Sequence, residues 1–289
     1  MNQPVTGPLS RRGTELLDDT TTDTIDRRPH QRAIDILEQA VAAGEPAAAA
    51  LLARGYRERG QLIEAHELLA PLVAGGRTDL AGVLADVLAD LDLADDAEQA
   101  YQVAIASNDG EAMNSFALFL AGQGRQAEAV VMFERAIAAG DVLAPADLAR
   151  TYLRDLHDIA AAQAVAERYL SADAPTTYCA LGEVYAELGR LDEAEHLLRT
   201  GIDLGAAQAH IDYARFLQHH RCDVDAAERE YRLAGDLHEP SWGYHLGAFL
   251  LEHGQDDEAA QVLELAAYWG DLDARGLLET EFEVVTDQA

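Results

Sequence analysis

Small and large apolar residues recur along this chain with a period of about 32 residues, a length typical of helical repeats. One alanine marks the period eight times: Ala33, Ala65, Ala97, Ala129, Ala161, Ala194, Ala226 and Ala259. A second small residue stands twelve positions before each of the last seven: Ala53, Ala85, Ala117, Ala149, Gly182, Ala214 and Gly247. A large apolar or aromatic residue directly precedes each of these, and another follows three positions later. Because such spacings share one helical face, each period predicts a first helix, a turn and a second helix.

The second helix of each period has its own pattern, with apolar residues four and seven positions after its alanine. In the fifth period, Leu198 and Gly201 follow Ala194 in this way. The sixth period fits when counting starts at Ala227, so its inner turn is predicted to be one residue longer. The fourth period fits least well, with its best start at Ala162, and we interpret it as a degenerate repeat.

The periodic stretch has clear ends and internal turns. Glycines that favour a left-handed helix end stand between the two helices of four periods: Gly60, Gly124, Gly189 and Gly254. We expect one repeat domain over residues 31–283, with an opening half-pair at 33–45 and a closing helix near 272–282. Residues 1–30 lack a sustained helical period and are predicted to form a disordered or loosely docked arm, and 284–289 a short tail.

The charge of the chain bears on its binding partners rather than on its fold. The net charge is −31, and all 21 basic residues are arginine. Five arginines and five acidic residues lie among the first 32 positions, so residues 33–289 carry 16 arginines against 47 acids. Such a surface repels nucleic acid phosphates and anionic lipids, so neither nucleic acid nor membrane is an expected partner.

Two cysteines, Cys179 and Cys222, are too few for a disulfide framework and suit a reducing compartment. No apolar run approaches the roughly 18–20 residues that span a bilayer. No apolar stretch follows the pair Arg11–Arg12, which excludes a twin-arginine export signal. The predicted location is the cytoplasm.

The fifth period carries the sharpest motif, with Tyr178, Leu181-Gly182, Tyr185, Gly189 and Ala194 at fixed spacing. This segment resembles the tetratricopeptide repeat, and the resemblance extends in weaker form over about residues 33–282. It implies an all-α fold: a right-handed superhelical solenoid of stacked antiparallel helix pairs, with about seven to eight repeats. The closing proline of the family is missing and the period is slightly shorter than that of the family, and both features lean toward the related SEL-like repeats.

In tetratricopeptide proteins the first helix of each pair lines a concave groove, and this resemblance supplies the candidate site. The predicted partner-binding residues are Arg54, Arg57, Asn114, Arg150, Arg154, Arg215 and Tyr244. The arginines are expected to form local basic pockets that meet carboxylates or phosphates. The alternative is that they pair with acids of neighbouring helices, such as Asp86, Asp90 or Glu187. The lysine–asparagine clamp of chaperone-binding members does not appear.

Catalytic and metal sites find little support in the sequence. His219, His220 and Cys222 lie close together, but a zinc site needs four converging ligands, usually in paired spacings. A nucleophilic cysteine needs a general base within reach, and the sequence indicates none for Cys179. The acids from Asp90 to Asp96 lack the glycine and the final glutamate of a calcium loop. We therefore expect no enzyme activity, no cofactor and no bound metal.

The sequence thus predicts a non-catalytic scaffold or adaptor that binds a peptide or protein in its groove. The expected partner is basic, or carries anionic groups that the groove arginines meet. The alternative function is a regulatory subunit of an enzyme complex, with the arm at 1–30 contributing to the contact.

Overall fold

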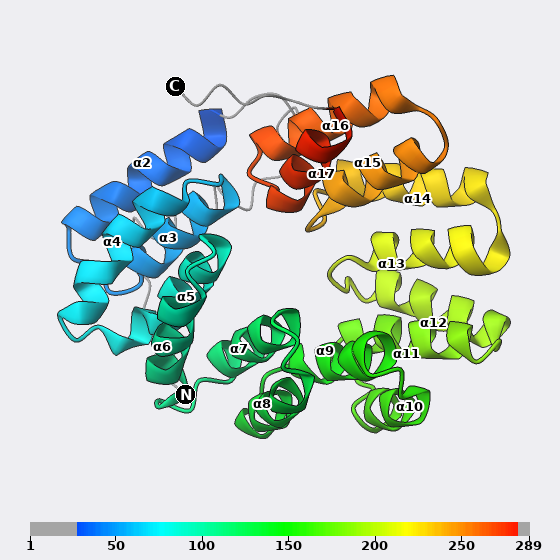
Figure 1. Cartoon of the computed structure of the whole chain (residues 1–289), viewed down its shortest axis with the longest axis horizontal. Coiled ribbons are helices and arrows are strands. Elements are labelled where there is room, and N and C mark those ends of the chain that lie inside the picture. The colour runs from blue at the N-terminus through cyan, green and yellow to red at the C-terminus, as the bar shows by residue number, and fades with distance from the viewer. Residues whose placement is uncertain (1–27, 283–289) are drawn as a thin grey trace. The chain divides into compact units, whose positions relative to one another are not determined.

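The computed structural model describes residues 28–282, and helices account for nearly all of that stretch (Figure 1). Sixteen α-helices follow one another within the described residues, which contain one isolated bridge between Ser171 and Ala174 but no strand. The predicted all-α fold class is confirmed. The predicted arm lies almost wholly, and the predicted tail wholly, outside the described residues.

Seven consecutive helix pairs stand between an opening and a closing helix in the described residues, as the period predicts. The opening helix is α2 (Arg28–Ala42) and the closing helix is α17 (Leu272–Phe282). The pairs are α3 (Ala48–Glu58) with α4 (Leu62–Ala74), α5 (Ala81–Asp90) with α6 (Ala94–Ile105), α7 (Gly110–Gly122) with α8 (Gln126–Ala139), α9 (Ala144–Arg150) with α10 (Ile159–Arg168), α11 (Thr176–Glu187) with α12 (Leu191–Asp203), α13 (Ala209–Phe216) with α14 (Val224–Asp236), and α15 (Trp242–Glu252) with α16 (Asp256–Tyr268).

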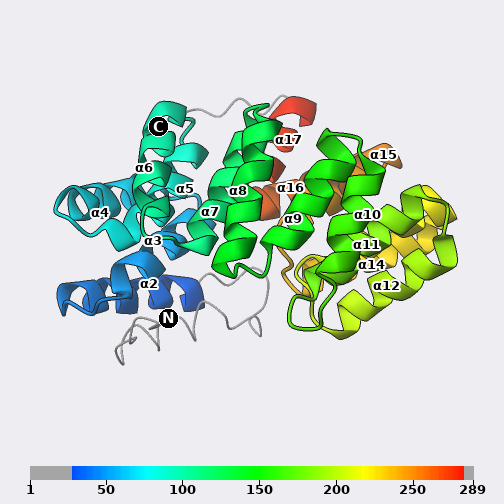
Figure 2. The same cartoon turned by 90° about the horizontal axis from the view of Figure 1, so that it is seen from below.

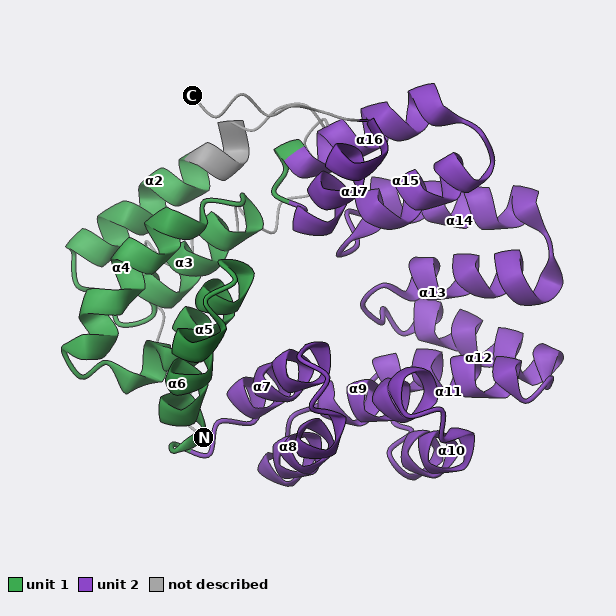
Figure 3. Cartoon of the chain, viewed as in Figure 1, with its two compact units in different colours: residues 1–107, 268–270 green, residues 108–267, 271–289 purple. Residues whose placement is uncertain are grey.

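The chain divides into two compact units (Figure 3). The first comprises residues 1–107 with 268–270, and the second comprises residues 108–267 with 271–289. In the first unit, each helix from α2 to α6 packs on the next. In the second unit, the helices from α7 to α15 pack on one another in chain order, and Figure 2 shows α9, α10, α11 and α12 of this series. Helix α11 also contacts both α9 and α13. The first helices of three successive repeats therefore touch directly.

Small residues lie where the two helices of a pair meet, as the period predicts. The five alanines of this set are fully buried: Ala53, Ala85, Ala117, Ala149 and Ala214. A Cβ on Gly182 would stand 2.8 Å from Leu198 Cγ, and one on Gly247 would stand 2.5 Å from Leu263 Cδ2. Since real Cβ atoms do not come so close, these glycines are what allows the helices to approach.

Turn glycines also take the predicted conformation. The four glycines between the helices of a pair have φ from +66° to +75°: Gly60, Gly124, Gly189 and Gly254. This left-handed geometry ends the first helix and satisfies its last carbonyls, which is why glycine recurs there.

Two repeats contain a π-helical turn at the end of the first helix. In the fourth repeat, α9 continues as η2 (Thr151–Asp155), and in the sixth, α13 continues as η3 (Leu217–Arg221). The Leu156 amide donates to the Thr151 carbonyl at 3.1 Å, a bond across five residues. These are the two repeats whose second helix starts one residue late, at the fully buried Ala162 and Ala227.

The extra residue of the sixth repeat therefore lies within the first helix and not in the connecting turn, where the spacing predicted it. A π turn absorbs one residue and lets the second helix keep its register against the core. The fourth repeat uses the same device, so its irregular spacing reflects an insertion in an otherwise normal helix pair.

Candidate partner-binding surface

First helices of five successive repeats in the second unit line a common surface. A cavity of about 330 Å³ is lined by residues of α7, α9 with η2, α13 and α15, including Leu118 from α7 and His245 from α15. A larger cavity of about 510 Å³ is lined mainly by η2, α11, and α13 with η3, and also by Ile159 of α10 and Leu198 of α12. Arg154, Asp212 and Arg215 line both cavities. The predicted register, which puts first helices on the binding side, thus corresponds to a hollowed surface in this unit.

A buried ionic cluster forms the base of this surface. The Arg150 guanidinium of α9 donates to Glu183 of α11 at 2.8 Å and to Asp212 of α13 at 2.6 Å. Arg154 of η2 donates to the second oxygen of Glu183. Only 16% of the Arg150 side chain and 5% of the Asp212 side chain are exposed. One guanidinium therefore ties together three consecutive first helices.

Burial and charge set opposite protonation tendencies for the two carboxylates. Burial raises the pKa of Asp212 to about 6, and the neighbouring negative charge of Glu183 acts in the same direction. The positive charge of Arg150 opposes this shift but does not cancel it. Burial works in the same direction on Glu183, but the guanidiniums of Arg150 and Arg154 outweigh it and hold the pKa of Glu183 below its ordinary value. Both carboxylates raise the pKa of Arg150 despite the burial of that side chain, so Arg150 stays charged.

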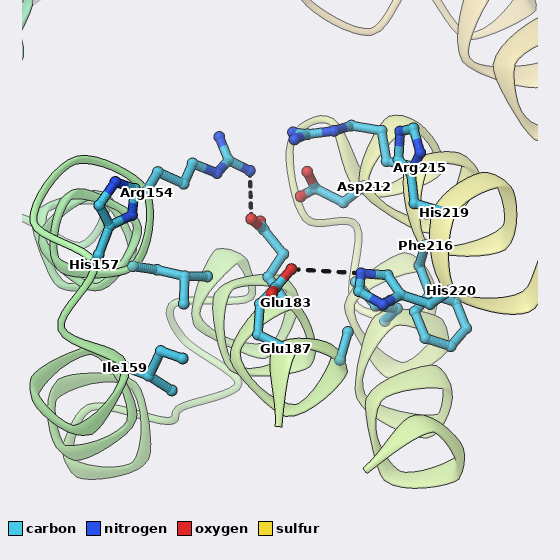
Figure 4. A pocket seen from close by; sticks show the side chains of 13 residues that line it. Arg154, His157, Ile159, Glu183, Glu187, Asp212, Arg215, Phe216, His219 and His220 are labelled. Carbon is cyan, nitrogen blue, oxygen red and sulfur yellow. Dashed lines mark hydrogen bonds and ion pairs between the residues drawn. The ribbon is translucent and has the colours of Figure 1, made fainter. Parts of the chain in front are cut away.

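The larger cavity combines an apolar floor with a charged rim (Figure 4). Its apolar lining is Leu153, Ile159, Ala186, Leu198 and Phe216. Arg154 and Arg215 point toward each other from opposite sides of the space above Glu183 and Asp212 (Figure 4). On a third side, His220 faces Glu187 at 3.6 Å.

Arg215 differs from the other arginines of this surface. Within the part of the chain that the structure describes, no carboxylate lies within ion-pair distance of its guanidinium, whereas Arg150 and Arg154 are both paired. Arg215 is half-buried and contributes to the electrostatic environment of Asp212 and Glu183 without bonding to either. Its donors therefore face the two cavities.

Two of the predicted site residues, Arg54 and Arg57, lie in the first unit. Arg57 of α3 pairs with Asp90 at 2.5 Å and with Asp86 at 3.5 Å, both on α5. Tyr101 donates its hydroxyl hydrogen to Asp86 at 2.7 Å. Arg54 is exposed on the same helix as Arg57. At Arg57, Arg150 and Arg154 the structure has the pairing that the sequence left open as the alternative to basic pockets.

The other two predicted residues lie in the second unit. Asn114 of α7 is buried and donates from Nδ2 to Asp147 of α9 at 2.9 Å. Burial raises the pKa of Asp147 in spite of this bond. Tyr244 of α15 is half-buried and packs against the apolar cluster that α16 and α17 form. A partner-binding role for all seven predicted residues remains a prediction.

Asp212 and His245 were missed by the sequence analysis, although a signal for them exists. Two positions before the small residue of each first helix stand Leu51, Val83, Ser115, Asp147, Ala180, Asp212 and His245. The first repeats place apolar or small residues there, so the polar side chains in the later repeats mark the altered surface. Burial lowers the pKa of His245 to about 4, so this imidazole is neutral near pH 7.

Neither metal nor nucleophile chemistry is indicated by this geometry. Residues 28–282 contain no group of three or more His, Cys, Asp and Glu side chains arranged to hold a metal ion. Burial raises the pKa of the Cys179 thiol far above neutral, which leaves no reactive thiolate. None of the described helices combines the length and the apolar character needed to cross a membrane.

Comparison with known proteins agrees with this architecture. A tetratricopeptide repeat model matches residues 110–139, which hold α7 and α8, and another matches residues 175–204, which hold α11 and α12. The two repeats with π turns lie outside both matches. No curated protein matches the chain.

Solved structures share the fold at low sequence identity. They include a chain of the APC/C hetero-tetramer Cut9–Hcn1 (TM-score 0.54, 14% identity, 95% of this chain and 56% of that chain covered). Yeast Tom70 is also similar (TM-score 0.59, 15% identity, 96% and 65% covered). An IFIT1 monomeric mutant solved with Gppp-AAAA matches too (TM-score 0.56, 15% identity, 88% and 69% covered). This chain thus spans less than two thirds of the length of the first two, and the likeness shows the fold alone.

Seven antiparallel helix pairs with a regular period define a helical-repeat solenoid, in which each pair buries its apolar face against its neighbours. Two of these pairs match the tetratricopeptide repeat, and the fold is shared with solved helical-repeat structures, which supports a repeat protein of the tetratricopeptide type. Proteins of this kind generally mediate protein–protein interactions. The two matches do not distinguish the SEL-like variety, which stays a prediction.

Proposed function

We propose that the surface formed by α7, α9, α11, α13 and α15 binds a peptide or protein partner, and that the protein is a non-catalytic adaptor. The observation that carries this proposal is the pair of cavities of about 510 and 330 Å³ on the side lined by first helices. Concave, partly apolar hollows with a few convergent polar groups are where proteins bind ligands.

The buried ionic cluster supports this role because it makes the surface rigid. Arg150, Glu183 and Asp212 hold three helices in one arrangement, so little conformational freedom is lost when a partner binds. Arg215 and the unused donors of Arg154 remain available for anionic groups of a partner. The 47 acids against 16 arginines in residues 33–289 also attract basic segments, so both partner classes expected from the sequence remain in the proposal.

Nucleic acid is not the partner that we propose. IFIT1 was solved with Gppp-AAAA, but its likeness to this chain extends to the fold only. Phosphate contacts dominate the affinity of proteins for nucleic acid, and a net charge of −31 opposes them. Binding to membranes is not proposed for the same electrostatic reason. The two cysteines, Cys179 and Cys222, are both free thiols, which supports the cytoplasm as the proposed compartment.

Capture of binding partners from native lysate tests the proposal. The purified full chain and its Arg215→Glu variant, in which one charge of the surface is reversed, are compared as baits. The matched control is Arg229→Glu, at an exposed position on the second helix α14. We expect a stoichiometric partner that the wild type and Arg229→Glu retain and Arg215→Glu loses. Arg150 is unsuitable for this purpose, since its loss would leave Asp212 buried without a counter-charge.

A second bait separates the adaptor from the regulatory subunit. Deletion of residues 2–27 removes most of the predicted arm and leaves the described helices intact. A partner that survives Arg215→Glu but is lost on this deletion would move the contact to the arm and would refute the proposed surface.

A further inference from the structure

Both π turns contribute residues to the lining of the larger cavity. Leu153 and Arg154 come from the π turn η2, and His219 and His220 come from the π turn η3. Helix α11 lies between these turns and contributes Glu183, Ala186 and Glu187. A π turn widens the helix and re-aims the side chains that follow it, and such turns are frequent at functional sites. The first helices of five of the seven described pairs end without one.

The cavity has room for one large side chain, and part of its lining is apolar. Ala186 and Leu198 form a floor that is nearly or fully buried, and Phe216 is 3% exposed. The volume of about 510 Å³ lies in the ordinary range of ligand pockets, roughly 300–1,000 Å³. Ala186 is the smallest of the apolar residues that line the cavity, so a larger side chain at this position would occupy part of its space.

The rim selects the charge of the neighbouring group. Both oxygens of Glu183 are taken up by guanidiniums, and Asp212 bonds to Arg150. Glu187 faces His220. Among the described residues of this rim, Arg215 is the charged group without an opposite charge within ion-pair distance, and its planar fork suits carboxylate or phosphate oxygens.

We propose that this cavity is a specificity subsite that takes a large apolar side chain of a partner peptide, with an adjacent acidic group bound by Arg215. The inference deepens the proposed function and rests on it: the surface binds peptides, and the paired π turns determine which ones. A basic residue in the subsite would meet Arg215 and Arg154 with no uncompensated carboxylate to offset them.

Selection from a random peptide library on the immobilised full chain tests the inference. We expect enrichment of peptides that place an aromatic or large aliphatic residue next to Asp or Glu. Ala186→Leu fills the cavity, and it should weaken binding of an enriched peptide about ten- to a hundredfold, the effect of losing the burial of one large side chain. The same substitution at Ala127, an exposed position of the second helix α8 that lines neither cavity, should leave that affinity unchanged.

Two further variants keep the test decisive if Ala186→Leu does not fold. Ile159→Phe fills the cavity from its other side and should also weaken binding, and Arg215→Gln should weaken binding of acidic peptides but not of their Gln-containing versions. Enriched peptides resynthesised with phosphoserine or Gln at the acidic position distinguish a phosphate from a carboxylate as the preferred anion.

The outcomes separate the two proposals. Peptides whose affinity falls with Arg215→Glu but not with either cavity-filling variant would overturn the subsite and leave the binding surface standing. Enriched peptides without an apolar–acidic pair would also overturn the subsite. Failure to enrich any peptide would count against both.

Discussion

Asp212 shows how burial at a single residue couples the binding surface to pH. Its pKa is raised to about 6, against an ordinary value of 3.8. Between these two pH values the carboxyl group is mostly protonated in the folded chain and mostly ionised in the unfolded chain. Stability contributed by this group therefore increases as pH falls from about 6 toward 4, because the folded state binds more protons in that range. His245 acts in the opposite direction, since its lowered pKa of about 4 disfavours the folded state as pH falls below 6.5.

A comparison of variants isolates the contribution of Asp212. Asp212→Asn removes the titration and keeps a group that accepts from Arg150. We expect the free energy of unfolding of the wild type, relative to Asp212→Asn, to rise by about 2 kcal/mol between pH 7 and pH 4. Urea denaturation followed by circular dichroism at several pH values measures this difference. A difference that stays constant, or that falls with decreasing pH, would show that Asp212 is ionised normally.

Two residues without glycine's freedom occupy left-handed positions directly after the π turns. His157 has φ +52° and Cys222 has φ +54°, where four of the repeats without a π turn place glycine. A non-glycine residue in this conformation costs about 1 kcal/mol. We predict that Cys222→Gly raises the free energy of unfolding by roughly that amount, since Cys222 is exposed and its side chain is not needed for packing. Gly124→Ala, at a glycine with φ +75°, is the inverse control and should lower it.

At the scale of the helix, the crossing of α15 with α16 depends on glycine. A Cβ added to Gly243 would overlap Ala266, whose methyl group has no rotamer by which to move away. Gly243→Ala should therefore lower the free energy of unfolding by about 1–3 kcal/mol in spite of alanine's better helix propensity. Gly276→Ala in α17, where nothing lies within 4 Å, should raise it by about 0.5–1 kcal/mol.

Chemical denaturation of Gly243→Ala, Gly276→Ala and the wild type measures the change in the free energy of unfolding that each substitution causes. Equal effects of the two substitutions would mean that α15 and α16 are not held at the described distance. Hydrogen exchange of the amides in α15 and α16 shows whether the loss at Gly243→Ala is local, as nearest-neighbour packing in repeat proteins predicts.

The period was sufficient to predict the helix pairs, but not the ionic cluster. Since contacts between adjacent repeats recur once in every period, the sequence could propose pairs such as Arg57 with Asp90, which the structure has. The bond from Arg150 to Asp212 joins residues 62 positions apart, across two repeats. It exists because α9 and α13 both contact α11, and this depends on how tightly the repeats curve.

The places of the two inserted residues in the fold could not be predicted from the sequence either. The spacing showed one extra residue before Ala227, and the prediction that the connecting turn absorbs it was wrong. The structure places it in η3, since a π turn keeps the apolar face of α13 against the core up to Leu217, which is buried. A single sequence lists the residues of a surface, whereas the cavity between η2 and η3 depends on backbone geometry that the spacing leaves open.

For the molecule as a whole, the net charge of −31 opposes folding through repulsion among the acidic residues. Many arginines are already paired, as Arg150 and Arg221 are, so the remaining excess is negative. Salt screens exposed charges over about 8–10 Å and acts less on buried pairs, so the repulsion weakens more than the Arg150 cluster does.

We therefore predict that the thermal midpoint rises by roughly 5 °C when sodium chloride increases from about 20 mM to about 500 mM. Differential scanning fluorimetry at pH 7 measures it, with sodium and potassium chloride compared at equal ionic strength to exclude an effect of one particular cation. Affinity for a basic peptide should fall over the same range, because the attraction that draws it to the acidic surface is screened too. A midpoint that falls with salt would mean that surface ion pairs such as Arg232 with Glu258 stabilise the fold more than the charge excess destabilises it.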